Sequence, residues 1–551
     1  MKITGAEIII RSLEAHGINI VAGIPGGSNL PLYNALHKSG IKHILARHEQ
    51  GAGFIAQGMA RSTGHASVCF ATSGPGATNL ITALADANMD SIPVIAITGQ
   101  VPLSMMGKDS FQEVDIFSMA KSFTKKCYIA QSADDLEEII ADAFYTAMEG
   151  RPGPILIDIP KNVQQEYAIY KNLMPRIHKR IKYSDDRMIF EAAKMINNSR
   201  RPVLYIGGGV IMAEASEEIK ILAEKNCIPT ASTLMGLGVM PSGHAHNLGM
   251  LGMHGDLSTN LILDKADLLI AVGVRFDDRA VGRAIDFCRH ASIIHIDIDH
   301  SEIGKIKDTN LAIISDAGEA LRKLIPLINN DCRKEWTGIA DKIISDHKKN
   351  DSDMFDFEHP LGIIKKISGI MPENAIITTD VGQHQMWTTQ AYDFKSPRTF
   401  FTSGGLGTMG FGLPCAIGAA LANPDKTILC ISGDGSILMN IQELATLADY
   451  NLNIKIIIMN NGQLGLVRQQ QELFYDKNFC ASKFISSPDF AGIAEKFGIE
   501  SLDLEKVSFP EMELESALKG EGPMLINIPI YEDHNVLPMV EPGKANIEMI
   551  V

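Results

Sequence analysis

The sequence predicts an α/β protein made of three doubly wound parallel-sheet domains. Short β-branched apolar runs alternate with longer amphipathic stretches along the whole chain. The runs are continuously apolar rather than alternating, which is typical of strands buried on both faces in parallel sheets covered by helices. In chain order, the expected strands are residues 41–45, 68–71, 94–97, 155–158, 203–206, 268–272, 293–296, 376–379, 427–431 and 454–459.

Two polar segments divide this pattern. The chain has 551 residues, and at about 150 residues per domain it allows three to four domains. Residues 164–187 and 329–360 are highly charged and have no clear period, so we expect solvated helices or linkers there. The domains would then span residues 1–165, 185–328 and 360–551. The first and third share a loose similarity, because each has a glycine-rich segment (73–76 and 404–412) followed by an apolar helix.

Composition and charge exclude several classes of protein. Apolar residues make up 45% of the chain and charged residues 21%, which excludes a disordered, collagenous or disulfide-stabilised chain. The net charge of −15 argues against nucleic-acid binding, which needs clustered cations. The eight cysteines form no CxxC motif and no Cys/His cluster. This indicates a reducing compartment and no structural zinc or iron–sulfur cluster.

The N-terminus resembles no targeting segment. It lacks both the apolar core of a signal peptide and the Arg/Ser-rich composition of a transit peptide, so we expect a cytoplasmic protein. The uncharged stretch 400–424 is long enough to cross a bilayer, but it contains six glycines and two prolines. We therefore interpret it as a buried loop followed by a helix, and we expect no membrane association.

The strongest functional motif is Gly-Asp-Gly at 433–435, followed after 24 residues by Asn460 and Asn461. A strand leads into each part, with an amphipathic helix expected over 437–450. Asp434 and Asn461 would then follow neighbouring parallel strands, at the edge where open α/β sheets bind ligands. Carboxylate and amide oxygens suit Mg²⁺, and glycines at a helix N-terminus suit a diphosphate. The alternative is a pair of ordinary turns.

This combination resembles the signature of thiamine-diphosphate enzymes. The resemblance covers essentially the whole chain and narrows to the catalytic large subunits of acetolactate (acetohydroxyacid) synthases, most similar to isozyme I. It implies a pyrimidine-binding, a central FAD-binding and a diphosphate-binding domain, in that order. The matching motifs are residues 23–28, 46–58, 72–79, 110–115, 150–154, 158–161, 274–279, 380–387 and 404–412.

The resemblance assigns roles around thiamine diphosphate. In the family, the glutamate that corresponds to Glu49 hydrogen-bonds the pyrimidine ring and promotes the imino tautomer that deprotonates C2. Without the resemblance, Glu49 would be interpreted as a surface acid. The Gly407 carbonyl would accept from the exocyclic amine, and Met409 would hold the two rings in a bent conformer. Mg²⁺ would be bound by Asp434, Asn461 and the backbone oxygen of Gln463. The other implied contacts are Val381, Gly382, Gln383, His384, Gly433, Gly435, Ser436, Leu464 and Gly465.

For the central domain, the resemblance implies FAD without a net redox role. Three glycines follow the strand 203–206, but they do not form a GxGxxG fingerprint, so a domain without ligand is the alternative. The implied FAD contacts are Arg151, Gly207, Gly208, Gly209, Thr233, Leu234, Leu251, Gly252, Met253, His254, Gly273, Arg275, Asp277, Arg279, Asp297, Ile298, Asp316, Gln385 and Met386.

The implied reaction belongs to branched-chain amino acid biosynthesis. Pyruvate adds to C2 of the cofactor and loses CO₂, and the resulting carbanion attacks a second 2-keto acid. Pyruvate then yields acetolactate, and 2-ketobutyrate yields acetohydroxybutyrate. Arg279 would bind the second carboxylate, a surface ion pair being the alternative. The implied catalytic residues are Glu49, Gln112, Gly26, Gly27, Lys161 and Arg279, and the substrate pocket would contain Phe111, Met253 and Gln470 among largely apolar walls.

Gln470 departs from the commoner family pattern. Most relatives carry tryptophan there, and its indole contacts the extra methyl group of 2-ketobutyrate. One methylene is worth only about 1–3 kcal/mol in a pocket, and glutamine offers a poorer apolar surface. We therefore expect a weak preference for 2-ketobutyrate over pyruvate, and weaker binding of sulfonylurea-type inhibitors.

The resemblance also implies partners. Glu49 of one subunit and Asp434 of its partner would form one site, so at least a homodimer is needed, while a tetramer and a small regulatory subunit in trans stay open. Within the superfamily, the alternatives are a glyoxylate carboligase, which typically lacks the glutamate, a pyruvate oxidase or a simple decarboxylase. A non-catalytic scaffold subunit is the alternative from another class, and the presence of both Glu49 and Asp434 argues against it.

Overall fold

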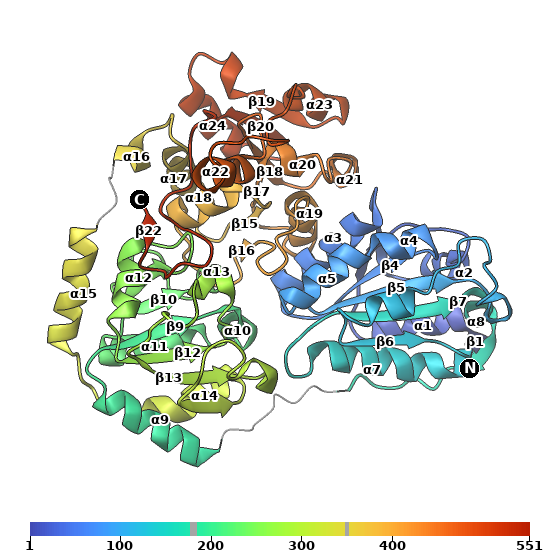
Figure 1. Ribbon diagram of the computed structural model, residues 1–551. Helices are drawn as coiled ribbons and strands as arrows, with labels where there is room; N and C mark the ends of the chain where they lie inside the picture. Colours follow the sequence, from blue (N-terminus) through green and yellow to red (C-terminus); the bar gives the residue numbers. More distant parts are fainter. Residues whose placement is uncertain (177–184, 348–351) are drawn as a thin grey trace.

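The computed structural model describes residues 1–176, 185–347 and 352–551. Three six-stranded parallel sheets, each covered by helices on both faces, form its framework (Figure 1). All ten expected strands are present, so the predicted α/β class is confirmed. The exact domain limits (1–165, 185–328 and 360–551) stay a prediction.

The N-terminal sheet has the strand order β3-β2-β4-β5-β7-β6. Helices α1 (Gly5–Ala15), α2 (Leu30–Leu36), α7 (Leu136–Met148) and α8 (Lys161–Gln165) pack on one face. On the other face lie α3 (Glu49–Thr63), α5 (Ile81–Met89) and α6 (Ile116–Ala120). The strands are β2 (Ile20–Gly23), β3 (Lys42–Leu45), β4 (Ser67–Ala71), β5 (Val94–Gln100), β6 (Lys126–Ile129) and β7 (Ile155–Pro160), and a small pair, β1 (Lys2–Thr4) and β8 (Tyr167–Ile169), lies beside the sheet.

The C-terminal sheet repeats this topology. Its order is β16-β15-β17-β18-β20-β19, so when the strands of each sheet are numbered from one to six along the chain, both sheets read 2-1-3-4-6-5. The similarity between the first and third parts of the sequence therefore reflects a shared strand order. The strands are β15 (Ile376–Thr379), β16 (Phe400–Phe401), β17 (Ile428–Gly433), β18 (Ile454–Asn460), β19 (Glu500–Asp503) and β20 (Met524–Pro529).

Helices cover both faces of the C-terminal sheet. One face packs against α17 (Pro360–Ile370), α18 (Gln383–Ala391) and α24 (Pro510–Lys519). The other packs against α19 (Gly412–Ala422), α21 (Glu443–Tyr450) and α23 (Phe490–Lys496). The prediction of one helix over 437–450 is wrong, because α20 (Asp434–Ile437) ends before a turn and α21 begins only at Glu443.

The central sheet has a different order, β11-β10-β9-β12-β13-β14, which reads 3-2-1-4-5-6 in chain numbering. This is the order of open sheets that bind dinucleotides where the strand order reverses, here between β9 and β12. Helices α9 (Asp186–Asn198), α11 (Ser216–Asn226) and α14 (Ala317–Leu324) cover one face, and α12 (Leu257–Asp264) and α15 (Lys334–Asp346) the other. The strands are β9 (Pro202–Ile206), β10 (Thr230–Ser232), β11 (Asn247–Met250), β12 (Leu268–Val272), β13 (Ser292–Asp297) and β14 (Leu311–Ile314).

The cysteine pattern needs one correction. Cys227, at the C-terminal end of α11, forms a disulfide with Cys332, and the two Cα atoms lie 4.9 Å apart. The scattered cysteine spacing, which indicated a reducing compartment, did not predict this pair. The two residues are 105 positions apart, so only the packing of α11 against the chain that precedes α15 brings them together.

The uncharged stretch at 400–424 is a loop followed by the buried helix α19, as expected, but it opens with the short strand β16 and the loop is exposed at Leu406. None of the helices in the described residues is long and apolar enough to cross a membrane.

Helices α3 and α19 join the N-terminal and C-terminal domains in a single apolar core (Figure 1). Their backbones approach closely at two glycines. A Cβ atom at Gly58 would overlap the Cys415 carbonyl oxygen, and one at Gly418 would overlap the Ile55 carbonyl oxygen. Only glycine therefore permits this helix contact.

We expect Gly418→Ala to lower the free energy of unfolding by about 1–3 kcal/mol, because α3 and α19 must separate to admit a methyl group. Thermal or denaturant unfolding measures the change. Gly338→Ala in α15 is the matched control, since no atom lies within 4 Å of the added Cβ. It should raise stability by about 0.4–1 kcal/mol, and equal effects of the two substitutions would contradict the packing argument.

Candidate active site

The segments after β15 and β17 meet at the carboxyl edge of the C-terminal sheet, where its strand order reverses. Ser436 Oγ donates to the Val381 carbonyl oxygen at 2.8 Å. A Cβ atom at Gly433 would lie 2.8 Å from His384 Nδ1. The structure thus brings the 381–384 segment against 433–436, as the sequence analysis expected.

Asp434 and Asn461 follow adjacent parallel strands. Gly433 at the end of β17 pairs with Met459 of β18, so both side chains start from the same edge of the sheet. Asn461 Nδ2 donates to Gln383 Oε1 at 3.1 Å, which leaves the amide oxygen as the atom that can serve a metal. A Cβ atom at Gly465 would overlap Gln383 Oε1 and would lie 2.6 Å from Asn461 Nδ2. This contact therefore requires glycine at 465.

Asp434 is a buried carboxylate with one unsatisfied oxygen. Its exposed fraction is 3%, and burial raises its pKa to about 6. Oδ1 accepts from the Gly435 N–H at 3.0 Å, and the backbone N–H groups of Gly462 and Gln463 also lie near the carboxylate. Oδ2 is buried and has no hydrogen-bond partner. A buried carboxylate oxygen in this state is costly unless a cation binds it, so it fits a metal ligand.

The donor set fits magnesium better than a transition metal. Among the described residues, no cluster of three or more His, Cys, Asp or Glu side chains could hold a metal ion. One carboxylate, one amide oxygen and a backbone oxygen are hard ligands, and they leave room for phosphate oxygens in an octahedral shell. His384 beside them is fully buried in an environment that lowers its pKa to about 3, so its ring is neutral, and its Nε2 has no partner.

Glu49 begins helix α3 and is 9% exposed. Asn79 Nδ2 donates to its Oε2 at 2.9 Å. The turn before it is held from the C-terminal domain, because Glu443 Oε1 accepts from the backbone N–H groups of Arg47 and His48 at 2.9 and 3.0 Å. The Glu49 carboxylate thus has a fixed position within its own domain.

The other expected N-terminal residues lie in the segments that follow β2, β5 and β7. A Cβ atom at Gly26 would lie 2.5 Å from Thr72 Oγ1, and one at Gly74 would lie 2.8 Å from the Gln112 carbonyl oxygen. Gly27 is next to Gly26, and Lys161 begins α8 directly after β7. Phe111 is 88% exposed, so one chain does not form the enclosed apolar pocket that we expected around it.

Met253 and Arg279 lie together in the central domain. The Met253 N–H donates to the Arg279 carbonyl oxygen at 2.8 Å, and Arg279 Nη1 lies 3.3 Å from Met253 Sδ. Met253 also packs with Met539 and Val540 of the C-terminal tail, against which Leu473 and Phe474 of α22 (Gly465–Phe474) pack. Gln470 lies one turn earlier on the same side of that helix. Figure 1 shows the tail running from the C-terminal domain down to the central domain.

The expected flavin residues gather mainly at the reversal point of the central sheet. A Cβ atom at Gly209 would lie 2.6 Å from Gly273 Cα, and one at Gly207 would overlap the Gly273 carbonyl oxygen, so the glycines line the crevice between β9 and β12. Asp297 ends β13, and burial raises its pKa to about 6. The remaining expected residues of this domain follow neighbouring strands: Gly208, Thr233, Leu234, Leu251, Gly252, His254, Arg275 and Asp277.

Five expected flavin residues lie away from this crevice or bond elsewhere. Asp316 caps α14 by accepting from the Glu319 N–H at 3.1 Å, and Gln385 Nε2 donates to Thr402 Oγ1 at 2.7 Å. Arg151 and Ile298 line a cavity of about 450 Å³ between the N-terminal and central domains. Arg151 there donates to Ser91 Oγ at 2.8 Å and to Glu302 Oε1 at 2.7 Å. Met386 follows Gln385 on α18.

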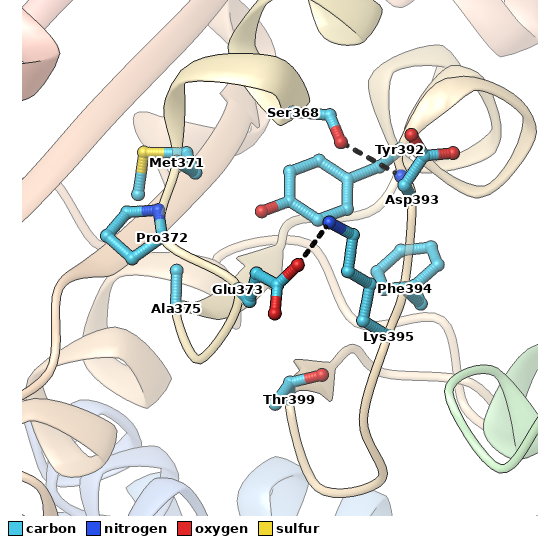
Figure 2. A pocket seen from close by; sticks show the side chains of 10 residues that line it. All are labelled: Ser368, Met371, Pro372, Glu373, Ala375, Tyr392, Asp393, Phe394, Lys395 and Thr399. Carbon is cyan, nitrogen blue, oxygen red and sulfur yellow. Dashed lines mark hydrogen bonds and ion pairs between the residues drawn. The ribbon is translucent and has the colours of Figure 1, made fainter. Parts of the chain in front are cut away.

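A second hollow, of about 10 Å³, lies at the opposite edge of the C-terminal sheet (Figure 2). Pro372 and Ala375 precede β15 there, and Lys395 donates to Glu373 Oε1 at 2.7 Å across its mouth. This volume holds about one water molecule. It lies at the wrong edge of the sheet for the candidate site.

The sequence analysis missed Asp380. Its carboxylate is fully buried and accepts from the Gly410 N–H at 2.7 Å and from Ser432 Oγ at 3.1 Å. It therefore connects the loops that follow β15 and β16 with the end of β17. Asp380 directly follows a predicted strand and opens the 380–387 motif, but neither feature led to a role for it.

The three domains match thiamine pyrophosphate enzymes. Residues 3–119 match the N-terminal TPP binding domain of this family, residues 189–324 its central domain and residues 380–528 its C-terminal TPP binding domain. The chain is 52% identical to the acetolactate synthase isozyme 1 large subunit of Escherichia coli, over 100% of this chain and 98% of that protein. It is 42% identical to the isozyme 2 large subunit of the same organism, over 99% of each chain. It is 43% identical to an acetolactate synthase of Arthrospira platensis, over 100% and 98% of the two chains.

We expect Gly465→Ala to weaken the binding of Mg²⁺ with diphosphate by about tenfold or more, because the new methyl group displaces Gln383 and Asn461 from their contact. Calorimetric titration with Mg²⁺ and inorganic pyrophosphate measures the affinity. Gly369→Ala, where nothing lies within 4 Å of the added Cβ, serves as the control. Unchanged binding in the Gly465 variant would remove this segment from the site.

Proposed function

The chain belongs to the acetolactate synthase large subunits of the thiamine pyrophosphate enzymes. We propose that the residues described above carry out the reaction of this family. The chain forms acetolactate from two pyruvate molecules as a thiamine-diphosphate-dependent transferase of branched-chain amino acid biosynthesis. The observation that carries the residue assignment is the unsatisfied Oδ2 of Asp434 beside Asn461 at the reversal point of the sheet.

Thiamine diphosphate supplies the carbon that bonds to pyruvate and the ring that accepts the electrons released with CO₂. Asp434, Asn461 and the Gln463 backbone oxygen hold Mg²⁺, and the 381–384 and 433–436 segments bind the diphosphate. His384 stays neutral there because of its burial. Gly407 and Met409 orient the pyrimidine ring. Glu49 holds a proton on the ring nitrogen, and its buried position supports this role.

FAD is the second proposed cofactor. The 3-2-1-4-5-6 strand order and the glycine contact between Gly209 and Gly273 support a dinucleotide at the β9–β12 crevice. Asp316 and Gln385 have less support as flavin contacts than the glycines, because both side chains already form hydrogen bonds within the protein. We propose that FAD binds without a net redox role, since the relatives are synthases rather than oxidases.

Two subunits are proposed to share each site. The hydrogen bond of the Glu49 carboxylate stays within the N-terminal domain, and Phe111 is largely exposed in a single chain. A partner chain that covers Phe111 and presents its own Asp434 edge accounts for both observations. A tetramer, a small regulatory subunit in trans, 2-ketobutyrate as the second acceptor and a cytoplasmic location stay predictions.

Glu49→Gln and Asp434→Ala should each reduce acetolactate formation from pyruvate to background, because one removes the ring proton contact and the other the metal ligand. Mixing the two inactive variants before dimerisation should restore about a quarter of normal activity, since half the dimers are mixed and carry one intact site. A pyruvate-only colorimetric assay measures both results. Glu335→Gln, on an exposed turn of α15, is the control. No recovery in mixed dimers would refute shared sites.

Gln470→Trp should raise the preference for 2-ketobutyrate over pyruvate by roughly tenfold, because an indole surface adds contact with one methyl group. Competition between the two keto acids at fixed total concentration measures the product ratio. Gln471→Trp, about 100° further round the helix, is the matched control. A wild-type enzyme that already prefers 2-ketobutyrate strongly would contradict the assignment of Gln470.

A further inference from the structure

The loop at 403–410 carries Gly407 and Met409 and lies between β16 and α19 without helix or strand structure. Its shape therefore depends on hydrogen bonds to other parts of the chain. The N-terminal domain supplies the acceptors from the end of α5. Asp90 Oδ1 accepts from the Gly405 N–H at 2.7 Å, and Asp90 Oδ2 accepts from the Gly404 N–H at 3.0 Å.

Asp86, one turn before Asp90, holds the other side of the loop. Its Oδ1 accepts from Ser403 Oγ and from Thr408 Oγ1, the latter at 3.0 Å. Ser403 Oγ in turn accepts from the Thr408 N–H at 2.8 Å. The two aspartates thus fix the backbone immediately before and after Gly407, which has a left-handed φ of 71°.

Burial of the two carboxylates makes the hydrogen bonds from the loop necessary. The side chains of Asp86 and Asp90 are fully buried, and Arg61 Nη2 donates to Asp90 at 2.8 Å and lies 3.7 Å from Asp86. Two carboxylates and one guanidinium leave a net negative charge inside the protein. Because an uncompensated buried charge is costly, the loop N–H and O–H groups are needed to stabilise it. The loop and the cluster therefore hold each other in one arrangement.

The loop has little freedom to move away. A Cβ atom at Gly404 would overlap Met235 Sδ of the central domain, and one at Gly405 would lie 3.0 Å from Asp90 Oδ1 and 3.3 Å from Arg275 Nη2. Residues of all three domains contact the chain at Gly404 and Gly405, although Leu406 and Gly407 beyond them are exposed. A change in the carboxylates is therefore expected to shift the backbone that leads to Gly407 and Met409.

We propose that Asp86 and Asp90 are positioning residues for the cofactor, which fix the Gly407 carbonyl and the Met409 side chain against its pyrimidine ring through hydrogen bonds to the loop. The proposal rests on the function proposed above, in which this loop contacts the ring. Arg61, Asp86 and Asp90 would thus affect the reaction only through the loop, because they contact neither the substrate nor the reacting atoms.

The test compares Asp90→Asn and Ser403→Ala with the full-length wild-type chain. Both should lower kcat by about tenfold to a hundredfold at saturating thiamine diphosphate and Mg²⁺, because a small displacement of aligned groups has this effect. The KM for pyruvate should change by less than about twofold, since the substrate contacts are intact. The near-ultraviolet circular dichroism of the bound cofactor should change as well, because it reports the asymmetric environment of the ring.

Asp267→Asn and Ser199→Ala are matched controls. Asp267 also accepts from a serine hydroxyl and two backbone N–H groups (Ser199 Oγ at 2.6 Å, Arg200 and Arg201 at 2.9 Å), but it precedes β12 at the edge away from the candidate site. These variants should keep the wild-type kcat and dichroism.

The results for the test variants and the controls decide between a positioning role and a merely structural one. If Asp90→Asn and Ser403→Ala bind the cofactor and retain the wild-type kcat and spectrum, the positioning role is wrong. It is also wrong if the controls lose as much activity as the test variants. Should Asp90→Asn fail to fold, Ser403→Ala decides, because it removes one hydroxyl donor and leaves the Arg61–Asp90 ion pair intact. Wild-type protein that takes up no thiamine diphosphate by calorimetry would refute the proposed function itself.

Discussion

The close docking of α3 onto α19 is the contact on which the candidate site depends. Gly58 and Gly418 let the two backbones touch, and the N-terminal and C-terminal domains share one apolar core as a result. Polar contacts between the same two domains accompany this approach. Glu443 of α21 accepts from the turn before Glu49, and Asp90 at the end of α5 accepts from Gly404 and Gly405.

Buried carboxylates then organise loops that have no regular structure of their own. Asp380 connects the loops after β15 and β16 with β17, and Asp86 and Asp90 of the N-terminal domain hold the loop after β16. Each accepts hydrogen bonds from loop N–H or O–H groups, which would otherwise be buried without partners. Asp86 Oδ2 and Asp434 Oδ2 are both buried without a hydrogen-bond partner, but Arg61 Nη2 lies 3.7 Å from Asp86 Oδ2. Backbone N–H groups rather than a cationic side chain lie near Asp434, so a metal ion would supply the positive charge there.

The central domain connects to the site by two routes. Arg275 donates to the Met89 carbonyl oxygen at the end of α5, beside the Asp90 cluster. The C-terminal tail pairs with Met253 through Val540 and donates from Asn546 to the Ala280 carbonyl oxygen. A dinucleotide in the β9–β12 crevice would therefore stabilise residues that border the proposed substrate region, which is a physical reason for a flavin that takes no part in net redox chemistry.

The sequence by itself determined the α/β class, the ten long apolar strands and the pairing of Asp434 with Asn461, because continuous apolar runs and residues that end parallel strands are local features. It also carried the family resemblance, which the comparisons bear out. The other eight strands of the three sheets were not predicted from the sequence; they are β2, β6, β10, β11, β14, β16, β19 and β20. The break at residues 438–442 and the Cys227–Cys332 disulfide depended on packing between distant segments. The same holds for Asp86, Asp90 and Asp380. An aspartate in a helix or after a strand is ordinarily solvated, and only burial against glycine loops from another part of the chain makes it an organising charge.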